Sequence, residues 1–428
     1  MDSRSPLFEP LRLGPIEAAG RVFKTATAET RASEDGFVTD ELVRVYEQWA
    51  RGGTPLIITG NLYVSAQGKS THRMCGVDAD DKVPGLARLA ETVHRHGAKL
   101  IGQLNHCGRQ VIVGHTGVVD PVSASSVLEP VLGTRPRALH AQEIPGVVES
   151  FAAAAERCRA AGFDGVQVHA AHGYLLSQFL TPHTNRRRDA WGGSLINRVR
   201  IVREVLRETR RRTGPDFAIL LKQNGHDRLP GRRGLGTEEC VQIARLLEAE
   251  GVDGIEVSVG HYESGFPMTA GTFDGFYRDL LENGLGRQMD AFRRTSLRLG
   301  QRLFDRVSRR LWPAEEGFNL ALARRFKQAL RVPVICVGGF HTRAAMESAL
   351  ESGATDAISC GRAFIADPWL VEHLRTGVPG PRCDYCNLCL ARSGTGPVDC
   401  WNPEVRAQKE KLLAEKGEAE PAHKGDAR

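Results

Sequence analysis

The feature that most constrains this chain is a regular alternation of short apolar, β-branched runs with helical segments. Helical patterns lie between several of the runs, at residues 39–53, 83–98, 146–163 and 237–251. Strands that alternate with helices form parallel sheets, and eight such units predict an α/β fold of the (β/α)8 or TIM barrel type. The expected strands are 21–27, 55–64, 99–106, 165–171, 218–225, 254–260, 333–339 and 357–363.

A doubly wound sheet is the alternative, but no G-x-G-x-x-G pattern follows the first expected strand. Residues 107–145 form a long connection rich in Gly and Pro, and residues 261–317 form an Arg-rich helical insertion after strand six. We expect a barrel domain over 1–380, a Cys-rich extension over 381–404 and a polar, disordered tail over 405–428.

Composition places the chain among ordinary globular proteins. Hydrophobic residues make up 41% of its 428 residues, and 57 basic residues face 51 acidic ones. This mild, scattered charge argues against a nucleic-acid partner. No apolar run approaches the length of a membrane span, and the start MDSRSPLFEPLRLGP has no apolar signal core. We therefore expect a cytoplasmic protein with a small-molecule substrate, and we leave homo-oligomerisation open.

Polar residues and glycines cluster where the expected strands end. Barrel enzymes place their chemistry at the carboxyl ends of the strands. A single histidine at such a position is more often a hydrogen-bonded structural residue, but a set on one rim indicates a site. The set comprises Gln103, His106, His169, His172, Lys222, Gly338 and Gly361.

The ends of strands seven and eight suggest an anion site. V-G-G at 337–339 and S-C-G-R at 359–362 place small residues, backbone N–H groups and Arg362 on neighbouring strands. Barrels commonly bind a phosphate there, because exposed amides and a following helix start favour an anion.

The stretch HAAHGYLLSQFLTPHTNRRRDAWGGSLINR, residues 169–198, is rich in groups that donate protons. Neutral imidazoles at His169 and His172 can donate two hydrogen bonds to one carbonyl oxygen, and Tyr174 holds a phenol nearby. Two other readings exist: these residues belong to the core, or the histidines bind zinc. The zinc reading lacks a third ligand at suitable spacing.

The same stretch resembles the signature of the Old Yellow Enzyme family, with further similarity in Q-L-N-H-C-G-R at 103–109 and at the V-G-G and S-C-G-R stretches. The resemblance covers about residues 6–380 and is nearest to the barrel domain of members related to 2,4-dienoyl-CoA reductase and trimethylamine dehydrogenase. It implies a (β/α)8 barrel that binds FMN over the strand ends. NAD(P)H reduces the flavin, which passes a hydride to an electron-poor alkene.

The resemblance also implies residue roles. His169 and His172 would hold the substrate carbonyl, Tyr174 would donate the proton, and Lys222 would lie near flavin N1 and O2. Contacts to the flavin pyrimidine, its ring edge and its phosphate would come from Gln103, from Ala26, Thr27, Ala28 and Gly60, and from Gly338, Gly339, Gly361 and Arg362. The chain departs from the family at Ala28, where a Thr or Cys that tunes the flavin potential often stands.

Four cysteines near the end of the chain, Cys383, Cys386, Cys389 and Cys400, are spaced C-x2-C-x2-C-x10-C. Four close thiolates suit a 4Fe–4S cluster or a tetrahedral zinc. The multi-domain relatives hold a cluster with one more residue in each of the last two gaps. Metal ligands and thiols without metal therefore both remain open readings.

Three functions are compatible with these observations. The favoured one is an FMN-dependent, NAD(P)H-driven ene-reductase, or the reverse desaturation of an enone or acyl-CoA. The second is flavin-dependent oxidative demethylation of a methylated amine, and the third is a flavin-binding subunit without alkene turnover. Because an amine cation gains nothing from two hydrogen-bond donors, the histidine pair favours the first.

Overall fold

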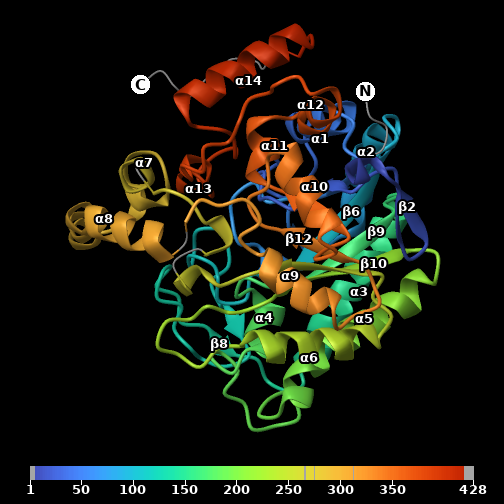
Figure 1. Ribbon diagram of the computed structural model, residues 1–428. Coiled ribbons are helices and arrows are strands. Elements are labelled where there is room, and N and C mark those ends of the chain that lie inside the picture. Colours follow the sequence, from blue (N-terminus) through green and yellow to red (C-terminus); the bar gives the residue numbers. More distant parts are fainter. Residues whose placement is uncertain (1–4, 265–266, 274, 312, 419–428) are drawn as a thin grey trace.

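The computed structural model describes residues 5–264, 267–273, 275–311 and 313–418, and their centre is a closed parallel barrel (Figure 1). Pairing of β4 with β6 closes the ring, and β13 pairs with β3. The expected TIM barrel is therefore confirmed. Its strands are β3 (Val22–Lys24), β4 (Leu56–Ile58), β6 (Lys99–Asn105), β9 (Gly165–Ala170), β10 (Ala218–Asn224), β11 (Gly254–Ser258), β12 (Val334–Val337) and β13 (Ala357–Cys360).

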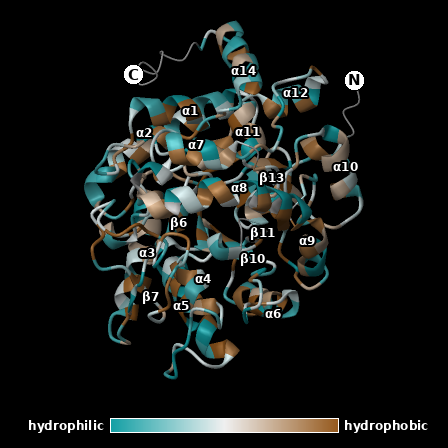
Figure 2. Cartoon of the chain, turned by 90° about the vertical axis from the view of Figure 1, so that its left-hand side faces the viewer, coloured by the Kyte–Doolittle hydropathy of each residue, from teal (hydrophilic) through white to brown (hydrophobic). Residues whose placement is uncertain are grey.

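Helices surround the barrel and present an apolar face to it. Thr39, Ser194 and Thr342 each cap a helix by accepting a hydrogen bond from a backbone N–H of its first turn. Figure 2 shows hydrophobic and hydrophilic residues alternating along these helices, as expected when one face is buried. The outer helices are α1 (Asp40–Arg51), α2 (Val83–His94), α3 (Ile144–Ala160), α5 (Leu195–Thr213), α6 (Thr237–Glu248), α9 (Leu320–Lys327), α10 (Arg343–Glu351) and α12 (Leu370–Thr376).

Shorter elements decorate this frame. They include the strands β1 (Leu11–Leu13), β2 (Ile16–Ala18), β5 (Leu62–Tyr63), β7 (Val122–Ser123) and β8 (Arg137–Ala138), and the helices α4 (Leu175–Leu180) and α11 (Arg362–Ala366). The hairpin β1–β2 closes the amino-terminal end of the barrel, because Leu13 and Ile16 join the barrel residues Phe23, Ile58 and Ile101 in one buried apolar cluster. The opposite end of the barrel is left to polar side chains.

The insertion after strand six and the Cys-rich extension pack against each other. The insertion contains α7 (Phe276–Glu282) and α8 (Ala291–Leu311), and the extension contains α13 (Leu388–Ala391) (Figure 1). Phe273, Phe276 and Tyr277 share a buried cluster with Ala391. An ion pair of 2.8 Å between Arg392 and Asp279 also joins the two segments.

The expected disordered tail is wrong for residues up to Glu415. Helix α14 (Pro403–Glu415) begins at Asn402, whose side chain accepts from the N–H groups of Glu404 and Val405. Its Leu412 and Leu413 pack on Trp369 of the barrel domain. The helix therefore gains its stability from tertiary burial, which the Lys- and Glu-rich composition conceals. Residues 419–428 lie outside the described residues.

Across the described residues, no helix combines the length and the apolar character that crossing a bilayer requires.

Candidate active site at the carboxyl end of the barrel

A polar layer lies above the apolar floor of the barrel. The Nε2 of Gln103 donates to Gln167 Oε1 at 2.7 Å, and the Nε2 of Gln167 donates to Glu256 Oε2 at 2.7 Å. The Nζ of Lys222 lies 3.3 Å from Glu256 Oε1 and donates to Thr25 Oγ1 at 2.9 Å. Because side chains along a strand alternate between two faces, residues of four strands meet here inside the ring, together with Thr25 directly after β3.

Lys222 and Glu256 form a buried ion pair within this layer. Burial by itself would raise the pKa of Glu256, but Lys222 and the hydrogen bonds from Ser359, Thr25 and Gln167 lower it. Glu256 is therefore ionised and compensates the charge of Lys222. The sequence indicated Lys222 as a cation of the site, but it did not reveal this counter-ion.

The layer of side chains nearer the carboxyl end of the barrel contains polar atoms that lack a hydrogen-bond partner among the described residues. Asn105 lies two residues beyond Gln103 on β6 and so faces the same side of the strand. It is fully buried, yet neither its Oδ1 nor its Nδ2 has a hydrogen-bond partner within the described part of the chain. Orphaned buried amides are rare in folded proteins, and a bound polar ligand would satisfy this one.

The residues around this layer fit the pyrimidine edge of a flavin. Ala26, Thr27 and Ala28 are partly exposed beyond the end of β3, whereas most of the chain around them is buried. A cation, an amide and a hydroxyl are present in Lys222, Asn105 and Thr27, which is the donor set that a ring carrying carbonyl and imino groups needs. These residues therefore suit the cofactor that the family uses.

Gly60 lies beyond β4 in a crowded position. A Cβ atom placed on it would come within 1.8 Å of Glu29 Oε2 and 2.5 Å of the Thr27 carbonyl oxygen. Glu29 is itself buried, and burial raises its pKa. The segments after β3 and β4 approach each other closely here, which explains the glycine. The contact of Gly60 with the flavin stays a prediction.

His169, His172 and Tyr174 are brought together as the sequence suggested. The ring of His169 lies 5.1 Å from that of His172 and 4.9 Å from that of Tyr174, in edge-to-face arrangements. The turn that achieves this is unusual, because His172 and Gly173 both have positive φ, at 60° and 79°. A Cβ on Gly173 would strike Gln110 and His261, so only glycine fits.

Burial keeps these three groups in defined protonation states. It lowers the pKa of both imidazoles well below its ordinary value, with further lowering of the His172 pKa by His169 and of the His169 pKa by Lys222. Burial raises the pKa of the Tyr174 phenol well above its ordinary value. Around neutral pH the site therefore presents two neutral imidazoles and a protonated phenol.

Two residues that the sequence did not single out as part of the site complete it. The Nε2 of His172 lies 2.6 Å from Ser258 Oγ at the end of β11, and the Tyr174 hydroxyl lies 3.0 Å from the Tyr262 hydroxyl. Both new residues come from strand six and the loop after it. Their position after a strand end was a usable signal, but neither belongs to the His-rich stretch.

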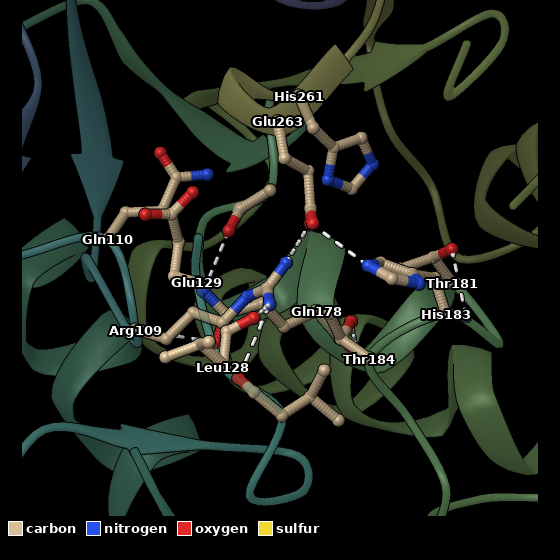
Figure 3. A network of polar contacts seen from close by, with 12 residues as sticks. Arg109, Gln110, Leu128, Glu129, Gln178, Thr181, His183, Thr184, His261 and Glu263 are labelled. Atoms are coloured by element: carbon tan, nitrogen blue, oxygen red, sulfur yellow. Dashed lines mark hydrogen bonds and ion pairs between the residues drawn. The ribbon is translucent and has the colours of Figure 1, made fainter. Parts of the chain in front are cut away.

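Glu263, which follows Tyr262 in the chain, anchors a buried charge network (Figure 3). Glu263 accepts hydrogen bonds from Arg109 and from Arg232, the latter at 2.6 Å, and lies 3.1 Å from His183 Nε2. Burial opposes its ionisation, but His183 and Arg109 lower the pKa of Glu263 to about 2. These contacts join three segments next to Tyr174 and Tyr262, namely the connection 107–145, the loop after β9 and the loop after β11.

At the ends of β12 and β13, where the sequence predicts a phosphate site, the residues make contacts within the protein that the sequence did not indicate. Arg362 donates to Asn387 Oδ1 at 2.7 Å and to the carbonyl oxygen of Ala270 at 2.8 Å. Cβ atoms on Gly338 and Gly339 would come within 3.0 Å of the segment 315–319. Gly338, Gly339 and Arg362 thus have structural roles. The phosphate contacts of these residues and of Gly361 stay predictions.

His106, which the sequence placed on the same rim, makes its side-chain contact within the turn after β6. Its Nδ1 accepts the N–H of Gly108 at 3.1 Å, and burial lowers its pKa to about 4. It therefore acts as a neutral hydrogen-bond acceptor that shapes the turn after β6.

The structure describes all four cysteines of the expected quartet. Among the residues that the structure describes, no three His, Cys, Asp or Glu side chains are placed to hold a metal ion. Cys383, Cys386, Cys389 and Cys400 are free thiols, and burial raises the pKa of each. A metal ion binds thiolates, so ligation and the loss of the thiol protons occur together. Metal binding by the quartet therefore stays a prediction.

The extension that carries these cysteines is not peripheral. The Tyr385 hydroxyl donates to the carbonyl oxygen of Gly339, and Asn387 accepts from Arg362. The Cys-rich segment thus contacts the two strand ends at which the phosphate was expected.

Comparison with known proteins identifies the family. The chain matches the NADH:flavin oxidoreductase / NADH oxidase family over residues 6–264 and 305–380. It is 34% identical to an NADH oxidase of Thermoanaerobacter brockii over 89% of this chain and 53% of that protein. It is 33% identical to a 4,4'-dithiodibutanoate disulfide reductase of Rhodococcus erythropolis over 91% and 93%. The chain thus spans about half the length of the first relative and nearly all of the second.

A solved structure of a 2-naphthoyl-CoA reductase with 2-naphthoyl-CoA superposes with a TM-score of 0.78 at 25% identity, over 95% of this chain and 58% of that one. The unmatched residues 265–304 fall within the insertion after strand six that the sequence predicted. With the barrel, the His-His-Tyr cluster and the family match in agreement, the chain belongs to the NADH:flavin oxidoreductase / NADH oxidase family of FMN-dependent enzymes that use NAD(P)H.

Proposed function

We propose that this protein reduces the carbon–carbon double bond of an α,β-unsaturated carbonyl compound. The observation that carries the proposal is the cluster of two neutral imidazoles and one protonated phenol at the carboxyl end of the barrel. Two donors aimed at one oxygen stabilise the negative charge that grows there, and the phenol supplies the proton that the carbon needs.

His169 has a defined tautomer in this proposal. Its Nδ1 accepts the N–H of Ala171 at 3.2 Å, so the proton of the neutral ring lies on Nε2 and is available to a substrate. For His172, donation from the Ser258 hydroxyl to Nε2 leaves the ring proton on Nδ1. Both imidazoles can then donate to the same carbonyl oxygen while Tyr174 protonates the α-carbon.

FMN, when bound, supplies the hydride that it has received from NAD(P)H. Lys222, Gln103, Asn105 and the partly exposed residues 26–28 would hold its ring, and the ends of β12 and β13 would face its phosphate. The apolar floor of the barrel would exclude water from this end of the site, because Phe23, Ile58 and Ile101 are fully buried.

Two other reactions compete with this one. The cluster equally supports the reverse desaturation, in which Tyr174 would accept the proton. One observation favours reduction of a disulfide: the relative that this chain covers over 93% of its length is a 4,4'-dithiodibutanoate disulfide reductase. Oxidative demethylation of an amine is disfavoured, because a cationic substrate gains nothing from two N–H donors. A cytoplasmic location, the absence of nucleic-acid and membrane partners and the domain boundary at residue 380 remain part of the proposal, and homo-oligomerisation stays open.

A titration with a phenol tests the carbonyl site. A phenolate oxygen resembles the enolate that the reaction would form, so para-hydroxybenzaldehyde should bind flavin-loaded protein and change its absorption spectrum. His172→Ala should weaken this binding by about a hundredfold, because one charge-directed donor is lost. His226→Ala, which replaces a half-buried histidine outside the cluster, is the matched control.

Anaerobic turnover completes the test. NAD(P)H should bleach the flavin, and cyclohexenone or 4,4'-dithiodibutanoate would then be offered to the reduced protein. Dimethylglycine, which donates electrons, would be offered to the oxidised protein instead. Reoxidation by the enone alone supports the proposal. Reoxidation by the disulfide and not by the enone, or phenol binding that His172→Ala leaves unchanged, would overturn it.

A further inference from the structure

A second buried ion pair lies on the outer side of the barrel ring, next to the segment 26–28. Lys24 ends β3, and its Nζ lies 3.9 Å from Glu29 Oε1, with side-chain exposures of 0% and 9%. Because Thr25 points into the ring, the preceding Lys24 points outward to helix α1. There its ammonium group lies 4.1 Å from the centre of the Trp49 ring. The reaction proposed above makes no use of this pair, and water solvates neither charge.

The pair holds the segment after β3 through hydrogen bonds. Lys24 Nζ donates to the carbonyl oxygen of Thr25 at 2.7 Å and to Thr27 Oγ1 at 2.9 Å. Thr27 Oγ1 in turn donates to Glu29 Oε1 at 3.4 Å. The Thr27 hydroxyl therefore accepts from the cation and donates to the carboxylate, which is the direction that the two charges favour. These contacts fix the backbone that carries the partly exposed residues 26–28.

Glu29 also connects this segment to the end of β4. Its Oε2 fills the space beside Gly60, where a Cβ atom would come within 1.8 Å of it. The N–H of Gly60 donates to the Tyr46 hydroxyl at 2.8 Å, and Tyr46 forms a further hydrogen bond with Glu29. One network of polar contacts thus joins residues 26–28 and Gly60, the two places that the family resemblance assigns to the edge of the flavin ring.

The two charges keep each other ionised against the effect of burial. Burial lowers the pKa of Lys24 to about 8, and Glu29 opposes this by raising it. Burial raises the pKa of Glu29, and Lys24 opposes this by lowering it, as do hydrogen bonds from Tyr46 and Thr27. Lys24 therefore loses its charge only a little above neutral pH, and the ion pair is lost with it.

Four other titratable groups face the pair. Tyr46 and Cys75 are close enough to Glu29 to interact with its charge, and burial raises the pKa of the Tyr46 phenol well above its ordinary value and that of the Cys75 thiol to about 12. Lys222 and Glu256 act on Lys24 from inside the ring, where they form an ion pair of their own. Deprotonation of Lys24 is therefore the change that we expect in this network between pH 7 and pH 9.

We propose that Lys24 and Glu29 are positioning residues of the flavin site, whose paired charges hold the segment 26–28 and Gly60 at the spacing that the edge of the flavin ring requires. A site that already has its bound arrangement loses less conformational entropy when the ligand binds, so the ion pair should increase the affinity for FMN. The inference rests on the proposed flavin contacts of these segments, and it assumes nothing about the substrate that the flavin reduces.

Binding of FMN between pH 7 and pH 9 tests this role. The dissociation constant of wild-type protein, measured from the fluorescence of flavin released on dilution, should rise about tenfold as Lys24 loses its proton, with a midpoint near pH 8. Glu29→Gln should move the midpoint to lower pH, because the carboxylate no longer raises the pKa of Lys24. Lys24→Met should bind FMN more weakly at pH 7 and should show no midpoint in this range. Packing alone would not make the midpoint follow the charge of Glu29.

Lys99→Met is the matched control. Lys99 begins β6 at the amino-terminal end of the barrel and has its own carboxylate partner, Asp164, at 2.9 Å. This variant should keep the affinity and the midpoint of the wild type. The proposal is overturned if the wild-type affinity is the same at pH 7 and pH 9, or if Lys24→Met keeps the wild-type midpoint. If Lys24→Met does not fold, the wild-type and Glu29→Gln profiles decide, because an unchanged midpoint in Glu29→Gln would also overturn it.

The outcome is independent of the alkene reaction. Protein that binds FMN without this pH dependence would contradict the positioning role of Lys24 and Glu29 and leave the proposed function intact. Reduced protein that does not react with an enone would contradict the proposed function, while the pH profile of FMN binding would still report on the ion pair.

Discussion

The phenol hydroxyls of Tyr174 and Tyr262 lie 3.0 Å apart, so tyrosines from the loops after strands four and six share one hydrogen bond. The two phenol pKa values are raised by burial, and both groups are therefore protonated near neutral pH. Tyr174 also lies next to His169. In the proposed reaction, Tyr262 would pass a proton to Tyr174 after each turnover and would take up another from solvent in its place.

Replacing Tyr174 by Phe should slow the reaction of reduced protein with an enone by about a hundredfold or more, because the positioned proton donor is lost. Flavin reduction by NAD(P)H needs no proton from this phenol and should hardly change. Stopped-flow absorbance of each half-reaction measures both effects. Tyr262→Phe removes only the hydrogen bond and should slow the enone step less. Equal slowing of both half-reactions by Tyr174→Phe would contradict its role as proton donor.

The flavin potential should respond oppositely to the two members of the buried ion pair. Lys222→Met leaves the charge of Glu256 uncompensated and should lower the potential. Glu256→Gln leaves Lys222 uncompensated and should raise it, in each case by about 30 mV or more, which is about 1.4 kcal/mol for two electrons. Redox titration against reference dyes measures these shifts. Shifts of the same sign in both variants would show that altered packing, and not charge, controls the potential.

Arg362 has a partner in Asn387, and this pair allows its phosphate role to be separated from its structural role. Arg362→Ala should release FMN on dialysis if the guanidinium binds the phosphate. Asn387→Ala removes the hydrogen bond between Arg362 and the Cys-rich extension but keeps the guanidinium and its contact with the Tyr385 ring. Flavin retained in Asn387→Ala and lost in Arg362→Ala would support phosphate binding. Equal loss in the two variants would assign Arg362 to the packing of the extension.

His106 should make the protein less stable as the pH falls. Its folded-state pKa of about 4 lies below the ordinary value of 6.5, so the unfolded chain takes up the proton first. Stability is therefore complete above about pH 6.5 and decreases as the pH falls towards 4, by about 2 kcal/mol at pH 5. His106→Asn keeps an acceptor for Gly108 and should remove this part of the pH dependence. Urea unfolding of the wild-type protein and of His106→Asn at pH 7 and pH 5 tests this prediction. Equal losses of unfolding free energy in the two proteins would show that His106 does not cause the pH dependence.

Local sequence pattern was sufficient to predict the barrel strands and to indicate the His169–Tyr174 cluster. Runs of β-branched residues and capped helices are short-range features, and they predicted all eight barrel strands. The spacing of His169, His172 and Tyr174 also brought them into contact, because one turn with a left-handed His172–Gly173 pair carries all three. The family signature lies in the same contiguous stretch.

Other features arise only when the barrel closes. Glu256 reaches Lys222, Thr25 and Ser359 because parallel strands place their inward residues at one level, and nothing in its own segment indicates this. The turning of Arg362 towards Asn387 and the burial of Leu413 depend equally on segments that are distant in the chain. The amino-acid sequence by itself determined which residues can form strands, turns and hydrogen bonds. The tertiary structure decided which charges compensate one another, because the free energy of a buried charge depends on neighbours that only folding assembles.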